Sequence, residues 1–250
     1  MRTEIFCFVY NRTDLLPRQL ACFRRYFKGE YNLNVVCDYR EEQYYDIFHS
    51  PYVDKFEEIC REEGVNFYKR KSEPGYGPSE YAGQTLTWAY ETIMKGQDAL
   101  ALLVDNDMFL IEDFNMEEYM EGYDFAGLHQ QRGDIEYIHP GIMLFNLKAV
   151  EDYNFHFHPC TINGQMLDSG GGTYELMNKL KFRNTNIEYP EEFNGIDLKE
   201  VDEGYGFELH IDQKVLHARN STGWHRGYQI IEGSNKNKTI NTILDEFLNG

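Results

Sequence analysis

Cysteine is scarce in this sequence of 250 residues. The five cysteines are scattered, odd in number and without a Cys-x-x-Cys pair, so neither a disulfide framework nor a structural zinc site is expected. Long apolar runs are also missing, because no stretch approaches the roughly 20 residues of a membrane-spanning helix. The opening "MRTEIFCFVYNR" is too short and too polar for a signal peptide. We therefore expect a cytoplasmic protein without a transmembrane segment.

Positively charged residues are also few. The chain has 24 lysines and arginines against 42 aspartates and glutamates, which gives a formal net charge of −18. A body this acidic repels a phosphate backbone, so nucleic acid is not an expected partner. Smaller anions are repelled as well, and any phosphate-bearing ligand would need a local cation to mediate its contact with the protein.

Hydrophobic residues are plentiful at 42% of the chain, and aromatic residues reach 15%, which is ample for a folded core. No internal repeat or low-complexity tract divides the sequence. The length fits one large domain.

The first half alternates strand-like and helix-like segments. Strands are predicted at 4–10, 33–39, 65–70 and 99–104, and helices at about 14–28, 41–63 and 79–95. The last strand, "ALALLV", is uniformly apolar, as a central parallel strand should be. This alternation predicts an open α/β sheet with parallel strands.

The second half is less regular. The segments "FAGLHQ" and "PGIMLFNL" look like further strands, the latter antiparallel. "GGGTYELMNKL" is expected to open a helix, "KVLHA" to form a short strand, and "TINTILDEFLN" to form a short amphipathic helix.

Polar side chains cluster where the predicted strands end. Asn11 and Arg12 follow the first strand, Asp38 ends the second, and Asp105 and Asp107 follow the fourth. Ligands of parallel α/β sheets bind beyond these carboxyl ends. In an extended segment residues i and i+2 point the same way, so the last two acids would converge. Paired carboxylates suit Mg²⁺ or Mn²⁺, although a strand-ending turn capped by aspartates is the alternative.

The segment "LLVDNDMFL", preceded by "FVYNR" and followed by "YIHPGIMLFNL", resembles the nucleotide-sugar glycosyltransferases of the GT-A fold. In that family an Asp-x-Asp motif ends the nucleotide-binding half, and a strand corresponding to Gly141 to Leu147 begins the acceptor half. The resemblance covers roughly residues 3–228. It implies a Rossmann-like, open mixed α/β sheet with helices on both faces. The single domain 1–250 would comprise a nucleotide-sugar half at about 1–107, an acceptor and metal half at about 108–228, and a helical tail at 229–250.

The resemblance also implies an activity. The chain would use Mn²⁺ or Mg²⁺ to move a sugar from a nucleoside diphosphate sugar, UDP by default, to a glycan or small hydroxyl acceptor. Tyr10, Asn11 and Arg12 would line the base pocket. Asp38 would accept a hydrogen bond from the base or the ribose.

A metal shell and a phosphate loop follow from the same resemblance. Asp105 would contact the ribose or the metal, Asp107 would bind the metal directly, and His217 would be the third protein ligand. His217 is also favoured because it ends an apolar strand and opens a polar loop suited to phosphate contacts. Ser221 and Trp224 in that loop would face the nucleotide. Some family members bind the diphosphate through a late lysine that this chain lacks, so a nearby cation would substitute: Arg219, His225 or Arg226.

Other histidines leave alternatives open. His156 and His158 in "FHFHPC" would alternate along a strand and could bind a metal, although packing is the commoner role. His129 and His139 flank the expected acceptor strand, where they could contact a sugar.

A general base is needed if the sugar inverts its configuration. Asp168 is the first candidate, because three following glycines permit close approach of the backbone to a sugar. Glu175 and Glu208 are secondary candidates. If configuration is retained, Asp168 would instead bind donor-sugar hydroxyls. Ser79 and Gln84, in a Gly/Pro-rich loop and its helix, would face the nucleotide.

Three other functions compete with this interpretation. A sugar-phosphate nucleotidyltransferase usually carries a glycine-rich loop after its first strand, whereas "YNRTDLLPRQL" has no glycine. A noncatalytic carbohydrate-binding protein could stack sugars on the 19 tyrosines and 17 phenylalanines, but such modules are usually all-β. A hydrolase would need a defined catalytic pair or triad, which the sequence does not display.

Overall fold

A seven-stranded sheet forms the centre of the computed structural model, which describes residues 1–39, 52–72, 78–193, 195–198, 206–219 and 235–249. The strand order is β12 (Phe182–Asn184), β8 (Phe125–Arg132), β9 (Ile135–Asn146), β5 (Leu100–Asp105), β1 (Thr3–Val9), β3 (Tyr31–Tyr39) and β4 (Asn66–Lys71). The strands from β5 to β4 are parallel, and β9 runs antiparallel to both β5 and β8. The expected mixed α/β sheet is confirmed.

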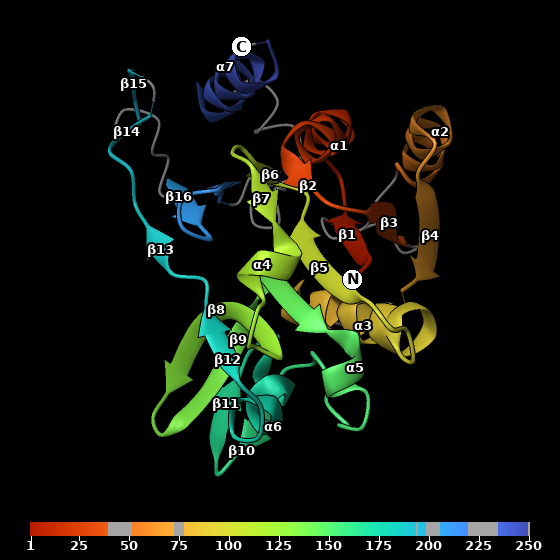
Figure 1. Ribbon diagram of the computed structural model, residues 1–250, viewed down its shortest axis with the longest axis vertical. Coiled ribbons are helices and arrows are strands. Elements are labelled where there is room, and N and C mark those ends of the chain that lie inside the picture. Colours follow the sequence, from red (N-terminus) through yellow and green to blue (C-terminus); the bar gives the residue numbers. More distant parts are fainter. Residues whose placement is uncertain (40–51, 73–77, 194, 199–205, 220–234, 250) are drawn as a thin grey trace.

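Helices cover both faces of this sheet (Figure 1). The helices α1 (Leu15–Tyr26) and α2 (Val53–Glu63) lie on one face, and α3 (Pro78–Ala89), prolonged by a π-helical segment at Tyr90–Met94, lies on the other. Along β1, Ile5 and Cys7 pack toward α1 and α2, whereas Phe6 packs toward α3. This alternation follows from the two-residue period of a strand.

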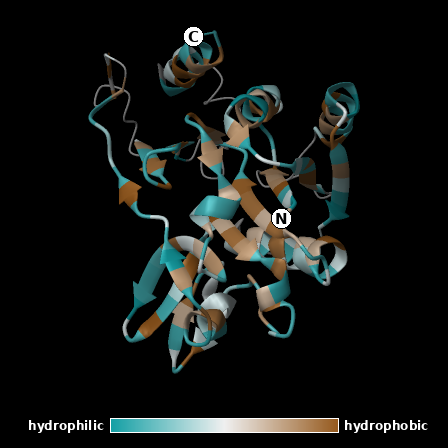
Figure 2. Cartoon of the chain, viewed as in Figure 1, coloured by the Kyte–Doolittle hydropathy of each residue, from teal (hydrophilic) through white to brown (hydrophobic). Residues whose placement is uncertain are grey.

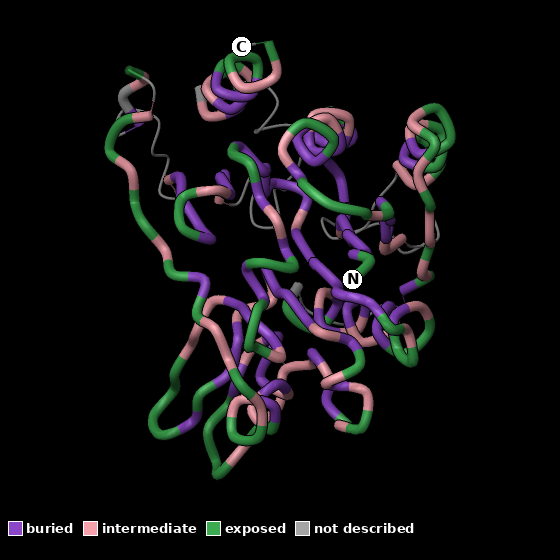
Figure 3. The backbone as a smooth tube through the Cα atoms, viewed as in Figure 1, coloured by how far each residue is buried: buried purple, intermediate pink, exposed green. Residues whose placement is uncertain are grey.

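The central strands are apolar on both faces for the same reason. They form the hydrophobic centre in Figure 2 and the buried centre in Figure 3. In β5, Leu100, Leu102 and Val104 pack against one helical layer, and Ala101 and Leu103 against the other.

A second, four-stranded antiparallel sheet has the order β13 (Ile187–Glu188), β16 (Phe207–His210), β17 (Val215–Ala218) and β6 (Met108–Leu110). Strand β6 follows β5 after a short turn, and His217 of β17 is the register partner of Met108. The N–H of Ala218 also donates to the carbonyl oxygen of Asp107 at 2.9 Å. This sheet therefore attaches a late part of the chain to the carboxyl end of β5.

Short elements complete the fold: β2 (Phe27–Lys28), β7 (Phe114–Asn115), α4 (Met116–Tyr119), α5 (Leu147–Val150), β10 (Cys160–Ile162), β11 (Gln165–Leu167), α6 (Tyr174–Met177), β14 (Glu192–Phe193) and β15 (Ile196–Asp197). The last helix, α7 (Asn235–Asn249), lies beside α1 (Figure 1). Arg18 of α1 pairs with Asp245 at 2.6 Å, and the Tyr26 hydroxyl donates to the Phe247 carbonyl at 2.8 Å. Within the described ranges, no helix has both the length and the hydropathy needed to cross a membrane.

Two predicted helices differ in their details. The helix expected at 79–95 is α-helical only to Ala89 and then widens into the π-helical segment. The helix expected in "GGGTYELMNKL" is a 3₁₀ turn at Gly171–Thr173 followed by the single turn of α6. Of the helix expected at 41–63, residues 41–51 lie outside the described part of the chain.

The expectation that His156 and His158 alternate along a strand is wrong. Within the described part of the chain, the backbone of the intervening Phe157 forms no ladder with a neighbouring strand. Its N–H donates to Thr87 Oγ1 at 2.9 Å, and its carbonyl oxygen accepts from the Gly170 N–H at 3.0 Å. This segment is fastened to a helix and a loop.

Candidate active site

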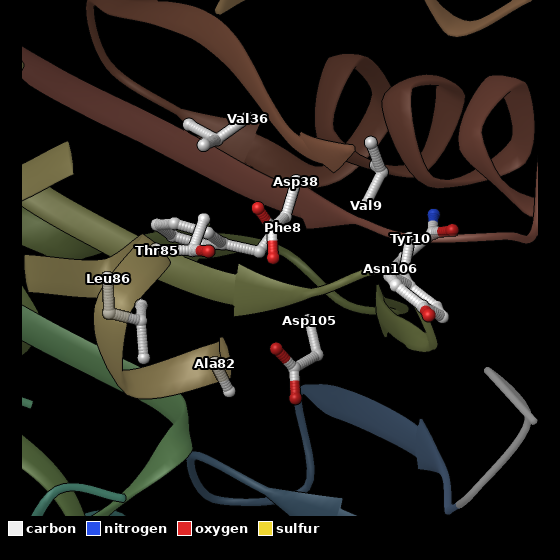
Figure 4. A pocket seen from close by; sticks show the side chains of 10 residues that line it. All are labelled: Phe8, Val9, Tyr10, Val36, Asp38, Ala82, Thr85, Leu86, Asp105 and Asn106. Carbon is white, nitrogen blue, oxygen red and sulfur yellow. The ribbon is translucent and has the colours of Figure 1, made fainter. Parts of the chain in front are cut away.

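A pocket lies at the carboxyl ends of β1, β3 and β5 (Figure 4). Its apolar lining is Phe8, Val9, Val36, Ala82 and Leu86, and its polar lining is Tyr10, Asp38, Thr85, Asp105 and Asn106. The empty volume is about 480 Å³, part of which is open to solvent. Helix α3 contributes one wall, and the Asp38 and Asp105 side chains come from strands on either side of β1.

Asp38 is held by a cation that the sequence analysis did not select. Arg70, its register partner on β4, donates from Nη1 to Asp38 Oδ1 at 3.2 Å and from Nη2 to Gln84 Oε1 at 2.7 Å. The Ser72 hydroxyl donates to the same Asp38 oxygen. One guanidinium therefore joins Asp38 and Gln84 beside the pocket.

The two acids of the Asp-x-Asp motif lie on a turn. Strand β5 ends at Asp105, and Asn106 and Asp107 form a turn before β6, so the expected extended alternation is wrong. Gln19, fully buried on α1, fixes the turn by donating from Nε2 to the carbonyl oxygens of Asp105 and Met108, both at 2.7 Å. Burial, and then the charge of Asp107, raise the pKa of Asp105 well above its ordinary value.

A cluster of carboxylates and imidazoles adjoins this turn. Glu208 and His210 share one face of β16, and Glu208 lies opposite His217 on β17. His217 Nδ1 is 2.9 Å from Glu208 Oε2, and His210 Nε2 is 3.2 Å from the same oxygen. The other nitrogen of His217, Nε2, is 3.6 Å from Asp107 Oδ1. The structure therefore brings Asp107, Glu208 and His217 together from separate parts of the chain.

Hydrogen bonds decide the charge of this cluster. Burial alone would raise the pKa of Glu208, but the bonds from His210 and His217 hold that pKa well below its usual range. The charge of Arg219, whose Nε is 3.1 Å from Glu208 Oε1, acts in the same direction. Burial lowers the pKa of His210 and brings that of nearby His139 to about 4. Glu208 is therefore an anion, and these two imidazoles are neutral at pH 7.

Asp168 begins the glycine-rich loop 168–172. Arg132 Nη2 donates to Asp168 Oδ2 at 2.7 Å, whereas Oδ1 is buried and, among the described residues, accepts no hydrogen bond. Burial, and then the charge of Asp168, raise the pKa of Tyr137 to about 12. Arg132 therefore fixes one carboxylate oxygen, and the same carboxylate acts on the nearby Tyr137 hydroxyl.

The glycine-rich loop is tied to the pocket helix. Ser169 donates its hydroxyl to Ser79 Oγ of α3 at 3.1 Å. Gly170 has φ +92°, and a Cβ there would lie 2.1 Å from the Ile138 carbonyl oxygen, so only glycine fits. Ser79 thus connects the pocket helix to the Asp168 loop.

The residues after β1 have separate environments. Tyr10 lines the pocket, whereas Asn11 and Arg12 are buried but are not among its lining residues. The guanidinium of Arg12 pairs with Asp14 at 2.7 Å and donates to Asn237 of α7. Arg12 therefore connects the end of β1 with the last helix.

The remaining candidates are not part of the cluster. Glu175 is exposed on α6 and pairs with Lys179 at 3.1 Å. His129 lies 3.6 Å from Glu136 in the β8–β9 pair. The candidates Ser221, Trp224, His225 and Arg226 lie outside the described residues.

Arg70 and His210 are two of the site residues that sequence reasoning missed. Arg70 stands at the end of a predicted strand, so the strand-end rule that selected Asp38 could have found it. His210 stands two residues after Glu208, a spacing that places both on one face of a strand once "FELH" is recognised as extended.

Comparisons with known proteins give structural matches alone. No protein-family model matches the chain, and no curated protein matches it. Among solved structures, the chain is similar to the 1–349 fragment of S. aureus TarS in complex with UDP, with 12% identity, a TM-score of 0.49, and coverage of 100% of this chain and 71% of that one. A longer TarS structure matches with 14% identity and a TM-score of 0.40, and this chain covers 30% of its length.

A second match is the mannosyltransferase PcManGT from Pyrobaculum calidifontis in complex with GDP-Man and Mn²⁺. The identity is 10%, the TM-score is 0.48, and the match covers 81% of this chain and 58% of that one. An active-site mutant of LgtC matches with 11% identity and a TM-score of 0.45, over 74% of this chain and 73% of that one. At these levels of similarity, the reaction of this chain has to be argued from its own site.

Proposed function

We propose that this chain is a metal-dependent glycosyltransferase that moves a sugar from a nucleoside diphosphate sugar to a glycan or another hydroxyl acceptor, with UDP as the expected nucleotide. One observation carries the proposal. His217 Nε2 lies 3.6 Å from Asp107 Oδ1, and the Asp107 turn also supplies Asp105 to a pocket of about 480 Å³. A nucleoside diphosphate needs a slot for its base and a cation for its phosphates, and these two features adjoin at one edge of the sheet.

Asp107 and His217 face each other closely enough to share a divalent ion, and His217 also belongs to a group of possible metal ligands with Glu208 and His210. Asp105 and Asp107 would supply carboxylate oxygens, and His217 would supply an imidazole nitrogen, a set that Mn²⁺ accepts and that Mg²⁺ accepts less readily. The raised pKa of Asp105 reflects burial and a neighbouring negative charge, both of which a bound cation would offset. When bound, the ion would neutralise the charge that develops on the diphosphate leaving group.

The pocket suits the base of a nucleotide. Phe8, Val36 and Leu86 provide apolar walls for a flat ring, and Asp38 provides a carboxylate at its edge. Because Arg70 and Ser72 hold Asp38 in place, its orientation is set before a ligand arrives. Asp38 is the proposed acceptor for an N–H group of the base.

Asp168 is the proposed base for an inverting transfer. The acceptor hydroxyl would attack the anomeric carbon, the bond from that carbon to the diphosphate oxygen would break, and the hydroxyl proton would pass to Asp168. Arg132 fixes one oxygen of this carboxylate, which supports the assignment. In a retaining transfer, Asp168 would bind a hydroxyl of the donor sugar.

Thermal unfolding with and without ligands tests the proposal. UDP plus Mn²⁺ should raise Tm by several degrees, since a ligand at a hundredfold excess over its Kd contributes about 2.7 kcal/mol. Asp107→Ala should remove the Mn²⁺-dependent part of the shift while leaving the protein folded. Asp54→Ala, which removes an exposed acid on α2, is the matched control and should keep the full response.

Other responses would assign the chain differently. Stabilisation by a nucleoside triphosphate with a sugar phosphate would indicate a nucleotidyltransferase, and stabilisation by a glycan alone would indicate a carbohydrate-binding protein. A wild-type chain that responds to no nucleoside diphosphate in the presence of Mn²⁺ would overturn the proposal. GDP in place of UDP tests the choice of nucleotide.

A further inference from the structure

The carboxylate of Glu208 is surrounded by hydrogen-bond donors. Its oxygen Oε2 is 2.9 Å from His217 Nδ1 and 3.2 Å from His210 Nε2, and Oε1 is 3.1 Å from Arg219 Nε. The side chain of Glu208 is only 6% exposed, and that of His210 only 2%. A buried carboxylate with three such donors is fixed in one orientation.

This arrangement determines which nitrogen of His217 carries a proton. Nδ1 lies at hydrogen-bond distance from a carboxylate, which can only accept, so the proton is on Nδ1. In the neutral ring, Nε2 is then the nitrogen with a free lone pair. It faces Asp107 Oδ1 at 3.6 Å, which is too long for a hydrogen bond. A lone pair and a carboxylate oxygen that face each other at this separation can share a cation.

Glu208 itself is a poor candidate for proton abstraction. Both of its oxygens already accept hydrogen bonds, Oε2 from His210 and His217 and Oε1 from Arg219. The same hydrogen bonds occupy the oxygens that it would need as a direct ligand.

We propose that Glu208 is a positioning residue, which holds the His217 ring with Nδ1 protonated and Nε2 directed at a cation shared with Asp107. This inference rests on the proposed function. In this role Glu208 is not the catalytic base, and it contacts the metal ligand His217 rather than the metal itself. A carboxylate that orients a ligating histidine in this way typically changes metal affinity 10- to 100-fold when it is removed.

Two substitutions separate positioning from the other roles. Glu208→Gln keeps an oxygen that can accept the His217 N–H, and the partly exposed Arg219 can turn toward water. Glu208→Ala removes the acceptor. We expect Glu208→Gln to bind Mn²⁺ within about threefold of wild type and Glu208→Ala to bind it about 10- to 100-fold more weakly, measured by calorimetry and by Mn²⁺ electron paramagnetic resonance.

The variants also give clear contrary outcomes. Equal loss of Mn²⁺ affinity in both would make Glu208 a direct ligand. A loss of about 10²- to 10⁴-fold in kcat for Glu208→Gln, with Mn²⁺ affinity unchanged, would make it the base. Either result overturns the proposal. Glu188→Gln, at an exposed glutamate of the same small sheet, is the matched control and should behave as wild type.

The tautomer of His217 gives a readout that needs neither metal nor activity. Nitrogen NMR of ¹⁵N-histidine-labelled protein should show the Nδ1–H form of His217 in wild type and in Glu208→Gln, and a mixture with the Nε2–H form in Glu208→Ala. The Nε2–H form in wild type would overturn the inference. A wild-type chain with the Nδ1–H form that binds no Mn²⁺ would refute the metal role and with it the proposed function.

Discussion

Asp105 is the residue at which folding and the proposed metal binding are most clearly opposed. Burial and the adjacent Asp107 raise the pKa of Asp105. Ionising this carboxyl group therefore costs more free energy in the folded chain than in the unfolded chain. Such a cost is expected where a site is arranged for a cation that the protein does not itself provide.

Replacing Asp105 with asparagine should therefore stabilise the metal-free protein at pH 7. The folded pKa of Asp105 lies above the ordinary value of 3.8, so its contribution to stability is fully present below pH 3.8 and is lost as the pH rises through the folded pKa. We therefore expect a measurable gain in the free energy of unfolding. Urea unfolding in EDTA at pH 7 measures the gain, and at pH 3.5 the difference should disappear. A less stable variant at pH 7 would contradict this account.

His139 should make stability depend on pH in a different window. Its pKa is lowered from 6.5 to about 4, first by burial and then by the charge of His217. The folded state therefore resists protonation, and stability falls as the pH drops from 6.5 to about 4, by at most about 3 kcal/mol. In His139→Asn, the amide oxygen can replace Nδ1 as acceptor of the Gly141 N–H, which now donates at 3.1 Å. The variant should lose less stability between pH 7 and 4.5, measured by urea unfolding; an unchanged pH profile would count against a neutral His139.

At the scale of elements, the segment 155–158 joins the pocket to the glycine-rich loop. A Cβ on Gly83 of α3 would lie 2.4 Å from the Phe157 carbonyl oxygen, and one on Gly172 would lie 2.3 Å from the His156 carbonyl oxygen. Both glycines therefore permit backbone contact on either side of the segment. The helix that lines the pocket and the loop that carries Asp168 are held at a fixed separation.

Gly83→Ala should destabilise the protein even though alanine favours helices. The gain in helix propensity is about 1 kcal/mol, whereas a forced backbone contact in a packed interior typically costs about 1–3 kcal/mol. The net effect should be a loss of up to about 2 kcal/mol, with a lower kcat because Asp168 moves relative to the pocket. Gly206→Ala is the control, since nothing lies within 4 Å of a Cβ there and its φ is not positive. Stability equal to that of the control would contradict the prediction, because it would show that the segment 155–158 can move to make room for the added methyl group.

The sequence predicted the elements that have strong local patterns. The strands β1, β3 and β5 have apolar runs with polar residues at or just after their carboxyl ends, so these ends and Asp38 and Asp105 were identifiable. Strand β16 has only four residues, and its pairing with β17 is a tertiary contact. His210 was missed for that reason, and the turn at Asp107 was mistaken for an extended segment because Gln19, distant in sequence, holds it.

At the scale of the whole molecule, the small sheet and the acidic surface act together. The β6–β17 pairing brings residues from the late part of the chain to the end of β5, although the predicted division into halves at about residue 107 stays a prediction. The whole chain has a formal net charge of −18. The field attracts a divalent cation and repels a diphosphate, so the order and strength of binding should depend on ionic strength.

Salt should therefore move the two affinities in opposite directions. Raising NaCl from about 20 mM to about 200 mM shortens the Debye length to less than about 10 Å. The Kd for Mn²⁺ should rise several-fold, because attraction to the acidic body is screened, whereas the Kd of the metal-free protein for UDP should fall. Uridine, which has no phosphates, is the control and should bind equally at both concentrations, all measured by calorimetry. If UDP instead binds more weakly at high salt without metal, local cations such as Arg70 or Arg219 dominate the phosphate site, and the metal is less essential than the net charge implies.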